Sequence, residues 1–442
     1  MKPTLALAAL AALLATLSTV PAGAASDLAA DIDQLATQGE PRLVEQRRAV
    51  HQNPELGNRE YKTGKLIAKR LKELGYDVQT GVAHTGVIGV LRGGKPGPVV
   101  GIRADIDALP VAEDTGLPFA STVKTTFDGK DVGVMHACGH DGHTAILLGV
   151  AEVASKLKAR WPGTLKLFFQ PAEEGPPAGE EGGAALIIKE GAFAKAPKPE
   201  VMFGLHILSE YDADQVAYRS GGAMASADDI DIVVHGKQTH GAAPWDGIDP
   251  IVVSAQIVLG LQTIASRQMD STLAPVIVTI GKIEGGVRNN IIPESVHLKG
   301  TLRSLDAGMR KDLHERVKRT IQKIAESAGA TADVEIGALT AYPVTYNDPA
   351  LTAAMVPTLA RVAGPGKLVD AKVLLGAEDF SFFAQEVPGL YVYVGARTPG
   401  TPKEQWYSNH SPKFHFDERN LKLGVRTLAN LAADYAADHA PK

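Results

Sequence analysis

Residues 136–174 read HACGHDGHTAILLGVAEVASKLKARWPGTLKLFFQPAEE. Residues 143–157 of this stretch carry apolar side chains at helical spacing, and residues 164–169 form a short apolar run that is typical of a buried strand. A helix followed by a buried strand is the repeating unit of an α/β fold. The polar residues at the two ends of the stretch therefore fall at the edge of a sheet, where open α/β sheets place their functional sites.

The same alternation extends over much of the chain. Before this stretch, helical spacing covers residues 41–50 and 60–74, and strand patterns cover 77–80, 86–92 and 99–104. After it, a strand pattern at 201–204 leads to His206. The later part has a helix at 348–362, strands at 372–374 and 390–394, and a last helix at 419–438. These elements predict an α/β catalytic domain with a mixed sheet.

A different order separates the two halves of that domain. The patterns between residues 220 and 338 give strand, helix, strand, strand, helix and strand, which is the order of the ferredoxin-like α+β module. We therefore predict an inserted satellite domain at 220–338, between the catalytic segments 27–219 and 339–442.

Composition excludes some classes of function. The 442 residues carry a formal net charge of −5, and 45% of them are hydrophobic. Such a chain is long enough for more than one domain and can bury a large core. Its basic residues are interspersed with acids, and no basic run with stacking aromatic residues is found, so we expect no nucleic-acid partner.

The amino terminus predicts export. Met1 and Lys2 supply a positive charge, residues 5–20 are mostly apolar, and residues 21–24 offer a small-residue cleavage site. An uncleaved anchor is the alternative, but the apolar run is shorter than the roughly 20 residues that a membrane helix needs. We expect a signal peptide over residues 1–24, a periplasmic or secreted mature protein, and no membrane contact after cleavage.

Cys138 is the only cysteine of the chain, so it cannot form an internal disulfide. It can be a buried structural residue, a nucleophile or a metal ligand. Its neighbours His136, His140, Asp141 and His143 favour a metal, because thiolates, imidazoles and carboxylates are the ligands of zinc and similar divalent ions. The adjacent pair of glutamates at 173 and 174 suits a metal and its water better than it suits a cysteine nucleophile. The residues alone thus indicate a metallohydrolase.

Seven segments in the same order give the chain a family resemblance. It resembles the dinuclear aminoacylase and carboxypeptidase-like metallohydrolases, in the branch of hippurate hydrolase, N-acyl-amino-acid amidohydrolase and the indoleacetyl-amino-acid hydrolases. The segments are 51–56, 103–110, 136–143, 170–174, 204–206, 285–293 and 410–412. The resemblance covers nearly the whole mature chain and implies the same two-domain architecture.

The resemblance also implies a site. Two divalent ions, Mn²⁺ or Zn²⁺ with Co²⁺ or Ni²⁺ as further candidates, are expected to be held by Cys138, His140, Glu174, His206 and His410. Cys138 is our choice for the bridging ligand. Glu173 is then the general base and acid, which takes a proton from the attacking water and protonates the leaving amine.

Three more residues are assigned by the resemblance alone. His240 matches the histidine that the satellite domain supplies to the active site, often from a partner subunit. Asn290 and Arg303 match positions that bind the substrate carboxylate or polarise its carbonyl, and an arginine fork suits a carboxylate. We expect Asp105, Asp107, Glu378 and Asp379 to support the ligands, and we expect a homodimer or a higher homo-oligomer.

Three functions are compatible with these residues. The leading one is hydrolysis of the amide bond of N-acyl or N-aroyl amino acids to a carboxylic acid and a free amino acid. A carboxypeptidase or dipeptidase that uses the same site is the enzymatic alternative, and a non-catalytic periplasmic binding protein of the same fold is the third. The loops 175–181 and 397–409 depart from the branch, so its substrate preferences cannot be transferred to this chain.

Overall fold

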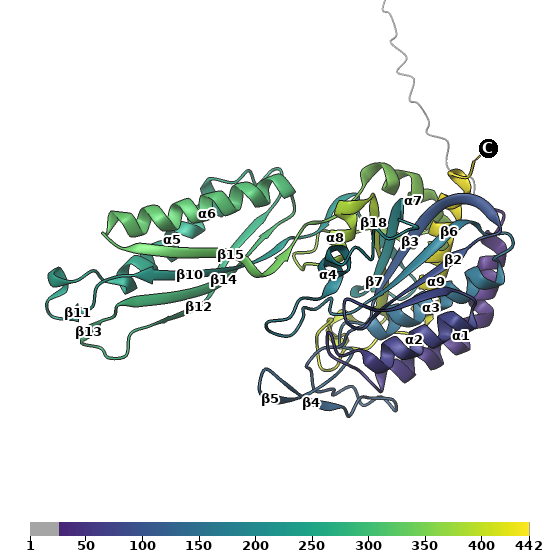
Figure 1. The fold of residues 1–442 in the computed structure, drawn as a ribbon, viewed down its shortest axis with the longest axis horizontal. Coiled ribbons are helices and arrows are strands. Elements are labelled where there is room, and N and C mark those ends of the chain that lie inside the picture. The colour runs from purple at the N-terminus through teal and green to yellow at the C-terminus, as the bar shows by residue number, and fades with distance from the viewer. Residues whose placement is uncertain (1–25, 442) are drawn as a thin grey trace, which may run out of the picture.

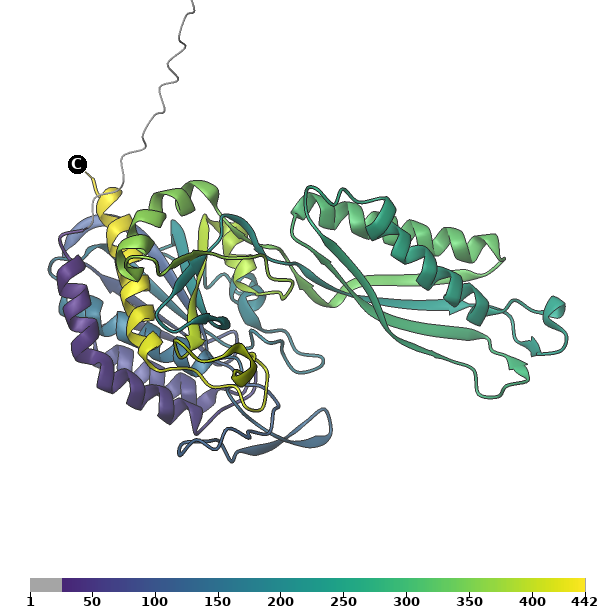
Figure 2. The ribbon, with the colours of Figure 1, turned by 180° about the vertical axis from the view of Figure 1, so that it is seen from behind.

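The computed structural model describes residues 26–441, which form two lobes (Figures 1 and 2). The larger lobe is built on an eight-stranded sheet, and the smaller lobe is built on a four-stranded antiparallel sheet. The predicted signal peptide, residues 1–24, lies outside the described residues. Within those residues, none of the helices combines the length and the apolar character that a membrane span requires.

The sheet of the larger lobe is mixed, as predicted. Its strand order is β1-β2-β6-β3-β7-β18-β8-β17, and the central strands β6, β3, β7 and β18 are parallel to one another. The bounds are β1 Asp77–Val82, β2 Gly86–Arg92, β3 Lys95–Asp105, β6 Pro162–Gln170, β7 Val201–Asp212, β8 Val216–Tyr218, β17 Leu368–Asp370 and β18 Gly389–Arg397. Because the central strands are parallel, the loops after their carboxyl ends meet at one edge of the sheet.

Helices cover both faces of this sheet. One face packs against α1 Ala29–His51, α2 Tyr61–Glu73, α3 His140–Lys156, α7 Pro349–Ala363 and α9 Arg419–Asp438. The other face packs against the short helices α4 Gly183–Lys189 and α8 Phe380–Glu386. The strand run at residues 100–104 is apolar apart from Arg103, as expected of a strand that is buried on both faces.

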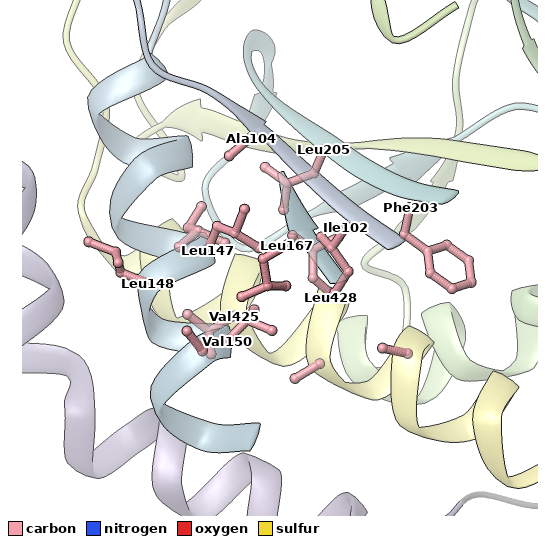
Figure 3. Close-up of a cluster of buried hydrophobic side chains, with 14 of the residues drawn as sticks. Ile102, Ala104, Leu147, Leu148, Val150, Leu167, Phe203, Leu205, Val425 and Leu428 are labelled. Carbon is pink, nitrogen blue, oxygen red and sulfur yellow. The ribbon is translucent and has the colours of Figure 1, made fainter. Parts of the chain in front are cut away.

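The core under the site lies between the sheet, α3 and α9 (Figure 3). Leu147 and Val150 of α3 and Leu428 of α9 are each at most 1% exposed. They pack on strands β3, β6 and β7 through the side chains of Ile102, Leu167 and Phe203. Full burial of one such side chain contributes about 1.5–3 kcal/mol, so this core holds α3 and its first residue, His140, firmly against the sheet.

The smaller lobe has the ferredoxin-like order. Its strands follow the spatial order β12-β14-β10-β15, and α5 and α6 cover one face of the sheet (Figure 1). The bounds are β10 Ala227–His235, α5 Pro250–Arg267, β12 Val276–Gly285, β14 Ser295–Ser304, α6 Ala307–Ser327 and β15 Thr331–Tyr342. The short strands β11 Thr239–His240 and β13 Ile291–Ile292 pair with each other at the end remote from the larger lobe (Figures 1 and 2).

Two chain crossings join the lobes. Ala227 at the start of β10 pairs with Tyr342 at the end of β15. On the side of the larger lobe, β9 Gly221–Met224 pairs with β16 Thr345–Asn347. The Tyr342 hydroxyl donates a hydrogen bond of 2.8 Å to the backbone carbonyl of Glu173, so the joint contacts the predicted base directly.

Two local predictions were wrong. The first helix begins at Ala29 rather than near Pro41, because the residues on either side of the proline bury a continuous face and the helix runs through it. A strand lies at Leu368–Asp370 instead of 372–374, where it pairs with β8 in parallel. A further hairpin that the patterns did not predict consists of β4 Lys124–Phe127 and β5 Lys130–Gly133.

Candidate metal centre

The turn at Gly139 brings two predicted ligands into one place. Gly139 has φ 99°, in the left-handed region that favours glycine, and α3 begins at the next residue. Cys138 and His140 therefore flank the turn. Both side chains are buried, at 6% and 1% exposed.

Cys138 lies between two histidines that come from distant parts of the chain. Its Sγ is 3.3 Å from Nε2 of His206 on β7 and 3.2 Å from Nε2 of His410, which lies in the loop after β18. The Nε2 atom of His410 is also 3.0 Å from Oε1 of Glu174. The structure thus gathers four of the five predicted ligands around one thiol.

His140 completes this group with a free nitrogen. Its Nδ1–H donates to the backbone carbonyl of Asp107 at 2.9 Å and lies 3.1 Å from the Asp107 carboxylate. This fixes the tautomer and leaves Nε2 as the lone-pair atom. Nε2 is buried without a hydrogen-bond partner among the described residues, and it lies 4.0 Å from Oε1 of Glu174.

The two glutamates are held by a turn with unusual backbone angles. Ala172 has φ 51°, and its amide donates to the buried carboxylate of Glu60 at 2.9 Å. The Glu174 amide donates to Asp107 at 3.0 Å. This turn lets Glu173 and Glu174 both reach the histidine cluster, with Oε2 of Glu173 also 4.0 Å from Nε2 of His140.

These residues fit divalent metal ions. Two groups of three ligand atoms, each within 4.8 Å of one another, share the thiol: one is Cys138 with His140 and His206, and the other is Cys138 with Glu174 and His410. Two ions that share one ligand need such an arrangement. His140 Nε2 is buried without a hydrogen-bond partner within residues 26–441, and a cation between it and Glu174 Oε1, which is 4.0 Å away, would explain this.

The electrostatics of the cluster favour a cation. Burial, and then the nearby carboxylates of Glu174 and Glu173, raise the pKa of the Cys138 thiol well above its usual value. Burial lowers the pKa of His206 well below its usual value, with His143 adding to the effect, so His206 stays neutral. The thiolate therefore forms only when a positive charge replaces its proton, which makes metal binding release protons.

Glu173 occupies a buried acidic environment. The side chain is 6% exposed, and ligand atoms of Glu173, Glu378 and Asp379 lie within 4.8 Å of one another. Burial raises the pKa of Glu173 well above its usual value, and the negative charge of Glu378 adds to this effect. A carboxylate that binds a proton so readily is suited to take one from water and pass it on.

Arg103 balances these acids and was missed as a site residue. Its guanidinium is fully buried and contacts Asp105 at 2.6 Å, Glu378 at 2.8 Å and Asp379 at 2.7 Å. The sequence signal was an arginine inside an apolar strand, because a charge in such a strand is buried only when it is paired. Three of the predicted supporting acids, Asp105, Glu378 and Asp379, thus contact Arg103, and the fourth, Asp107, contacts the proposed ligand His140.

His136 and His143 differ from the ligand histidines. His143 uses both ring nitrogens, since Nδ1–H donates to Asp105 at 2.5 Å and Nε2 accepts the amide of Ile207 at 2.8 Å. His136 is buried, and burial lowers its pKa to about 4. Neither ring nitrogen of His136 has a hydrogen-bond partner within residues 26–441.

His240 and Asn290 lie apart from this cluster in the same chain. His240 is on β11 and Asn290 precedes β13, at the remote end of the smaller lobe (Figure 1). Arg303 is half-buried on β14, opposite Ile277 of β12. Burial lowers the pKa of Arg303, and the charge of Asp228 opposes that effect.

The chain matches a known protein family and is similar to several known proteins. Residues 101–434 match the model of peptidase family M20/M25/M40. The chain is 42% identical to thermostable carboxypeptidase 2 of Saccharolobus solfataricus, over 89% of this chain and 95% of that protein. It is 36% identical to IAA-amino acid hydrolase ILR1-like 2 of Arabidopsis thaliana, over 90% of this chain and 86% of that protein.

A solved structure supports the same relationship. The YXEP protein of Bacillus subtilis, described as a dinuclear metal binding peptidase, superposes with a TM-score of 0.75 and 33% identity. The match covers 90% of this chain and 98% of that one. The family model matches most of the chain, and relatives of more than 30% identity cover about nine-tenths of it, so the protein belongs to peptidase family M20/M25/M40.

Proposed function

We propose that this metal-dependent amidohydrolase cleaves the amide bond of N-acyl or N-aroyl amino acids and releases a carboxylic acid and a free amino acid. The observation that carries the proposal is the buried Glu173 beside two ligand groups that share the Cys138 thiol. A binding protein has no need of a base in that position. The relative from Arabidopsis thaliana, an IAA-amino acid hydrolase, supports an aromatic acyl group.

We assign two divalent ions to five residues. Cys138, His140, Glu174, His206 and His410 would hold them, with Cys138 as the shared ligand. Mixed sulfur, nitrogen and oxygen ligands suit Mn²⁺ or Zn²⁺ and also accept Co²⁺ or Ni²⁺. When bound, the ions supply Lewis acidity, which makes water a nucleophile near neutral pH and polarises the amide carbonyl.

Glu173 performs the proton transfers in this mechanism. It accepts a proton from water as the water oxygen bonds to the amide carbon. The same carboxyl group then gives that proton to the nitrogen as the C–N bond breaks. Arg103 holds the neighbouring carboxylates of Glu378 and Asp379, and Tyr342 holds the Glu173 backbone, so the base keeps its position during both transfers.

A carboxypeptidase or dipeptidase is the second candidate. The relative from Saccharolobus solfataricus carries the name carboxypeptidase, and the proposed centre serves a peptide bond equally well. The two functions differ in the group that the pocket accepts on the carbonyl side of the scissile bond. This group is an acyl or aroyl group in the first function and an aminoacyl or peptidyl group in the second. Residues 175–181 and 397–409 are the loops that we expect to set this preference.

We also propose a homodimer in which the smaller lobe completes the site of the partner. This lobe exposes large apolar residues, namely Trp245 at 78%, Leu259 at 71% and Val287 at 90%. Its strand β12 is also an edge strand. In the dimer, His240 and Asn290 reach the substrate from the partner subunit, and Arg303 binds the carboxylate of the substrate. Residues 1–24 direct the protein to the periplasm or the exterior.

The test is amine release from a set of substrates. Enzyme depleted of metal with a chelator is assayed with and without Mn²⁺ or Zn²⁺ on N-acetyl, N-benzoyl and N-indoleacetyl amino acids and on plain dipeptides. We expect metal-dependent cleavage of the acyl amino acids. Cleavage confined to dipeptides would favour the peptidase, and binding without turnover under any metal would favour the binding protein.

A further inference from the structure

Asn409 lies in the loop between β18 and α9, directly before the proposed ligand His410. Its side-chain amide makes three hydrogen bonds: Oδ1 accepts from the amide of Ser209 at 3.1 Å, and Nδ2 donates to the carbonyls of Cys138 at 3.0 Å and Ile207 at 2.9 Å. Both donors of the amide are therefore used, and both go to backbone oxygens.

Each bond ends on a segment that carries a proposed metal ligand. Cys138 is itself a ligand, Ile207 follows His206, and Asn409 precedes His410. The three segments come from the turn before α3, from β7 and from the loop after β18. The Asn409 amide therefore bonds parts of the chain that are 202 and 271 residues away from it.

The bond to Ile207 also bears on the ring of His206. The Ile207 carbonyl accepts a second hydrogen bond, from Nδ1–H of His206 at 2.8 Å. That bond turns Nε2 of His206 toward the Cys138 thiol. Asn409 and the His206 ring thus meet at one carbonyl oxygen, so the position of the amide and the orientation of the ligand are linked.

The backbone at His410 needs this support. His410 has φ 69°, in the left-handed region, which costs a non-glycine residue on the order of 1 kcal/mol. Its amide donates to the carbonyl of Ala137 at 2.7 Å, beside Cys138. The neighbours Tyr407 and Ser408 are exposed, so the nearest preceding side chain of this loop that packs on the core is that of Trp406.

We propose that Asn409 is a positioning residue of the metal centre. It fixes Cys138, His206 and His410 at their mutual separations before any ion binds. This inference rests on the proposed function, because it takes these three residues as ligands. Removal of a group that orients ligands typically weakens metal affinity by about 10- to 100-fold.

The experiment compares metal binding by full-length N409A, N409D and the wild-type protein. Calorimetric titration of chelator-treated protein with Mn²⁺ gives affinity and stoichiometry. Titration with Co²⁺ adds a spectrum, since the thiolate-to-cobalt absorption band reports Cys138. N53A is the matched control, because Asn53 is exposed and its amide donates only to a helix carbonyl, that of Ala49.

We expect N409A to lose about 10- to 100-fold in affinity and to alter the cobalt band, with N53A unchanged. N409D keeps the shape but places a carboxylate oxygen against two carbonyl oxygens, so its loss should be at least as large. The metal-free unfolding midpoints of N409A and the wild type should agree within a few degrees.

Three outcomes would overturn parts of the argument separately. Equal affinities and cobalt spectra in N409A, N409D and the wild type would overturn the role of Asn409. A loss of affinity matched by an equal loss of metal-free stability would reduce Asn409 to a structural residue. A wild-type protein that holds no metal would instead overturn the proposed function itself.

Discussion

Glu173 and Glu174 carry the same functional group in different surroundings. Glu174 lies 3.0 Å from His410, whereas Glu173 faces the buried acids Glu378 and Asp379. We expect E173Q to lower kcat by about 100- to 10,000-fold, because an amide cannot take a proton from water. Metal content, measured by mass spectrometry of the purified protein, should stay at the wild-type level.

The control for this variant is E73Q. Glu73 is exposed at the end of α2 and pairs with Arg70, so its substitution should leave kcat unchanged. An active E173Q enzyme would show that the base is another residue. Loss of metal from E173Q would make Glu173 a ligand.

At the residue scale, the sequence predicts the chemistry of the site better than it predicts which residues contact one another. The residue types around Cys138 indicate a metal, and the structure brings all five predicted ligands together. Three histidines lie between residues 136 and 143. His136 and His140 both keep a buried ring nitrogen without a partner within residues 26–441, but of these two only His140 lies in a group of potential metal ligands. The free nitrogen of His140 and the use of both nitrogens of His143 depend on Asp105, Asp107 and Ile207, which lie outside α3. The role of Asn409 likewise depends on contacts between distant parts of the chain, which the sequence does not show.

At the scale of elements, Glu152 joins three helices. Its carboxylate on α3 contacts Arg42 of α1 at 2.6 Å, Arg70 of α2 at 2.8 Å and Lys156 at 2.8 Å. Burial favours the protonated acid, but hydrogen bonds from Lys156 and Arg42 outweigh it and lower the pKa of Glu152 to about 2. The charged form therefore stabilises the folded state.

We expect E152Q to lower the free energy of unfolding by about 2 kcal/mol at pH 7. The folded pKa is below the unfolded one, so this stability is present above pH 4.5 and is lost as the pH falls toward 2. Urea unfolding of the wild type and E152Q should show a difference that shrinks over that window. E326Q is the control, because Glu326 is an exposed residue of α6. A difference between the wild type and E152Q that persists below pH 2 would contradict the stabilising role of the Glu152 charge.

Element prediction succeeded where one pattern dominates. The last helix, Arg419–Asp438, has the predicted bounds, because its apolar face is regular along its whole length. The first helix extends 12 residues further toward the amino terminus than predicted, since tertiary burial outweighs the local effect of Pro41. Strand β17 has only three residues, and its position depends on pairing with β8, which no local pattern contains.

At the scale of the whole molecule, the remote position of β11 leads to a test in trans. If His240 serves the partner subunit, H240A and E173Q homodimers are each inactive, but a mixed dimer contains one site that lacks both substitutions. Random subunit exchange should therefore restore about a quarter of wild-type activity. The measurement is turnover of the best acyl amino acid after refolding or prolonged incubation of the mixture.

H235A is the matched control for this mixture. His235 lies on the same lobe and pairs with Asp333 on the surface, so H235A should be active alone. No recovery from H240A and E173Q, despite proven exchange of labelled subunits, would exclude the trans role. The ferredoxin-like order of this lobe was predictable because each element is local, whereas the partner of its apolar surface was not.

The hydrogen bond from Tyr342 to the Glu173 carbonyl has a pharmacological consequence. Tyr342 ends the strand that returns from the smaller lobe, so a reorientation of the lobes that moved Tyr342 would stretch a hydrogen bond to the backbone of the proposed base. A compound that wedges the lobes apart at this point would slow turnover without any metal-binding group.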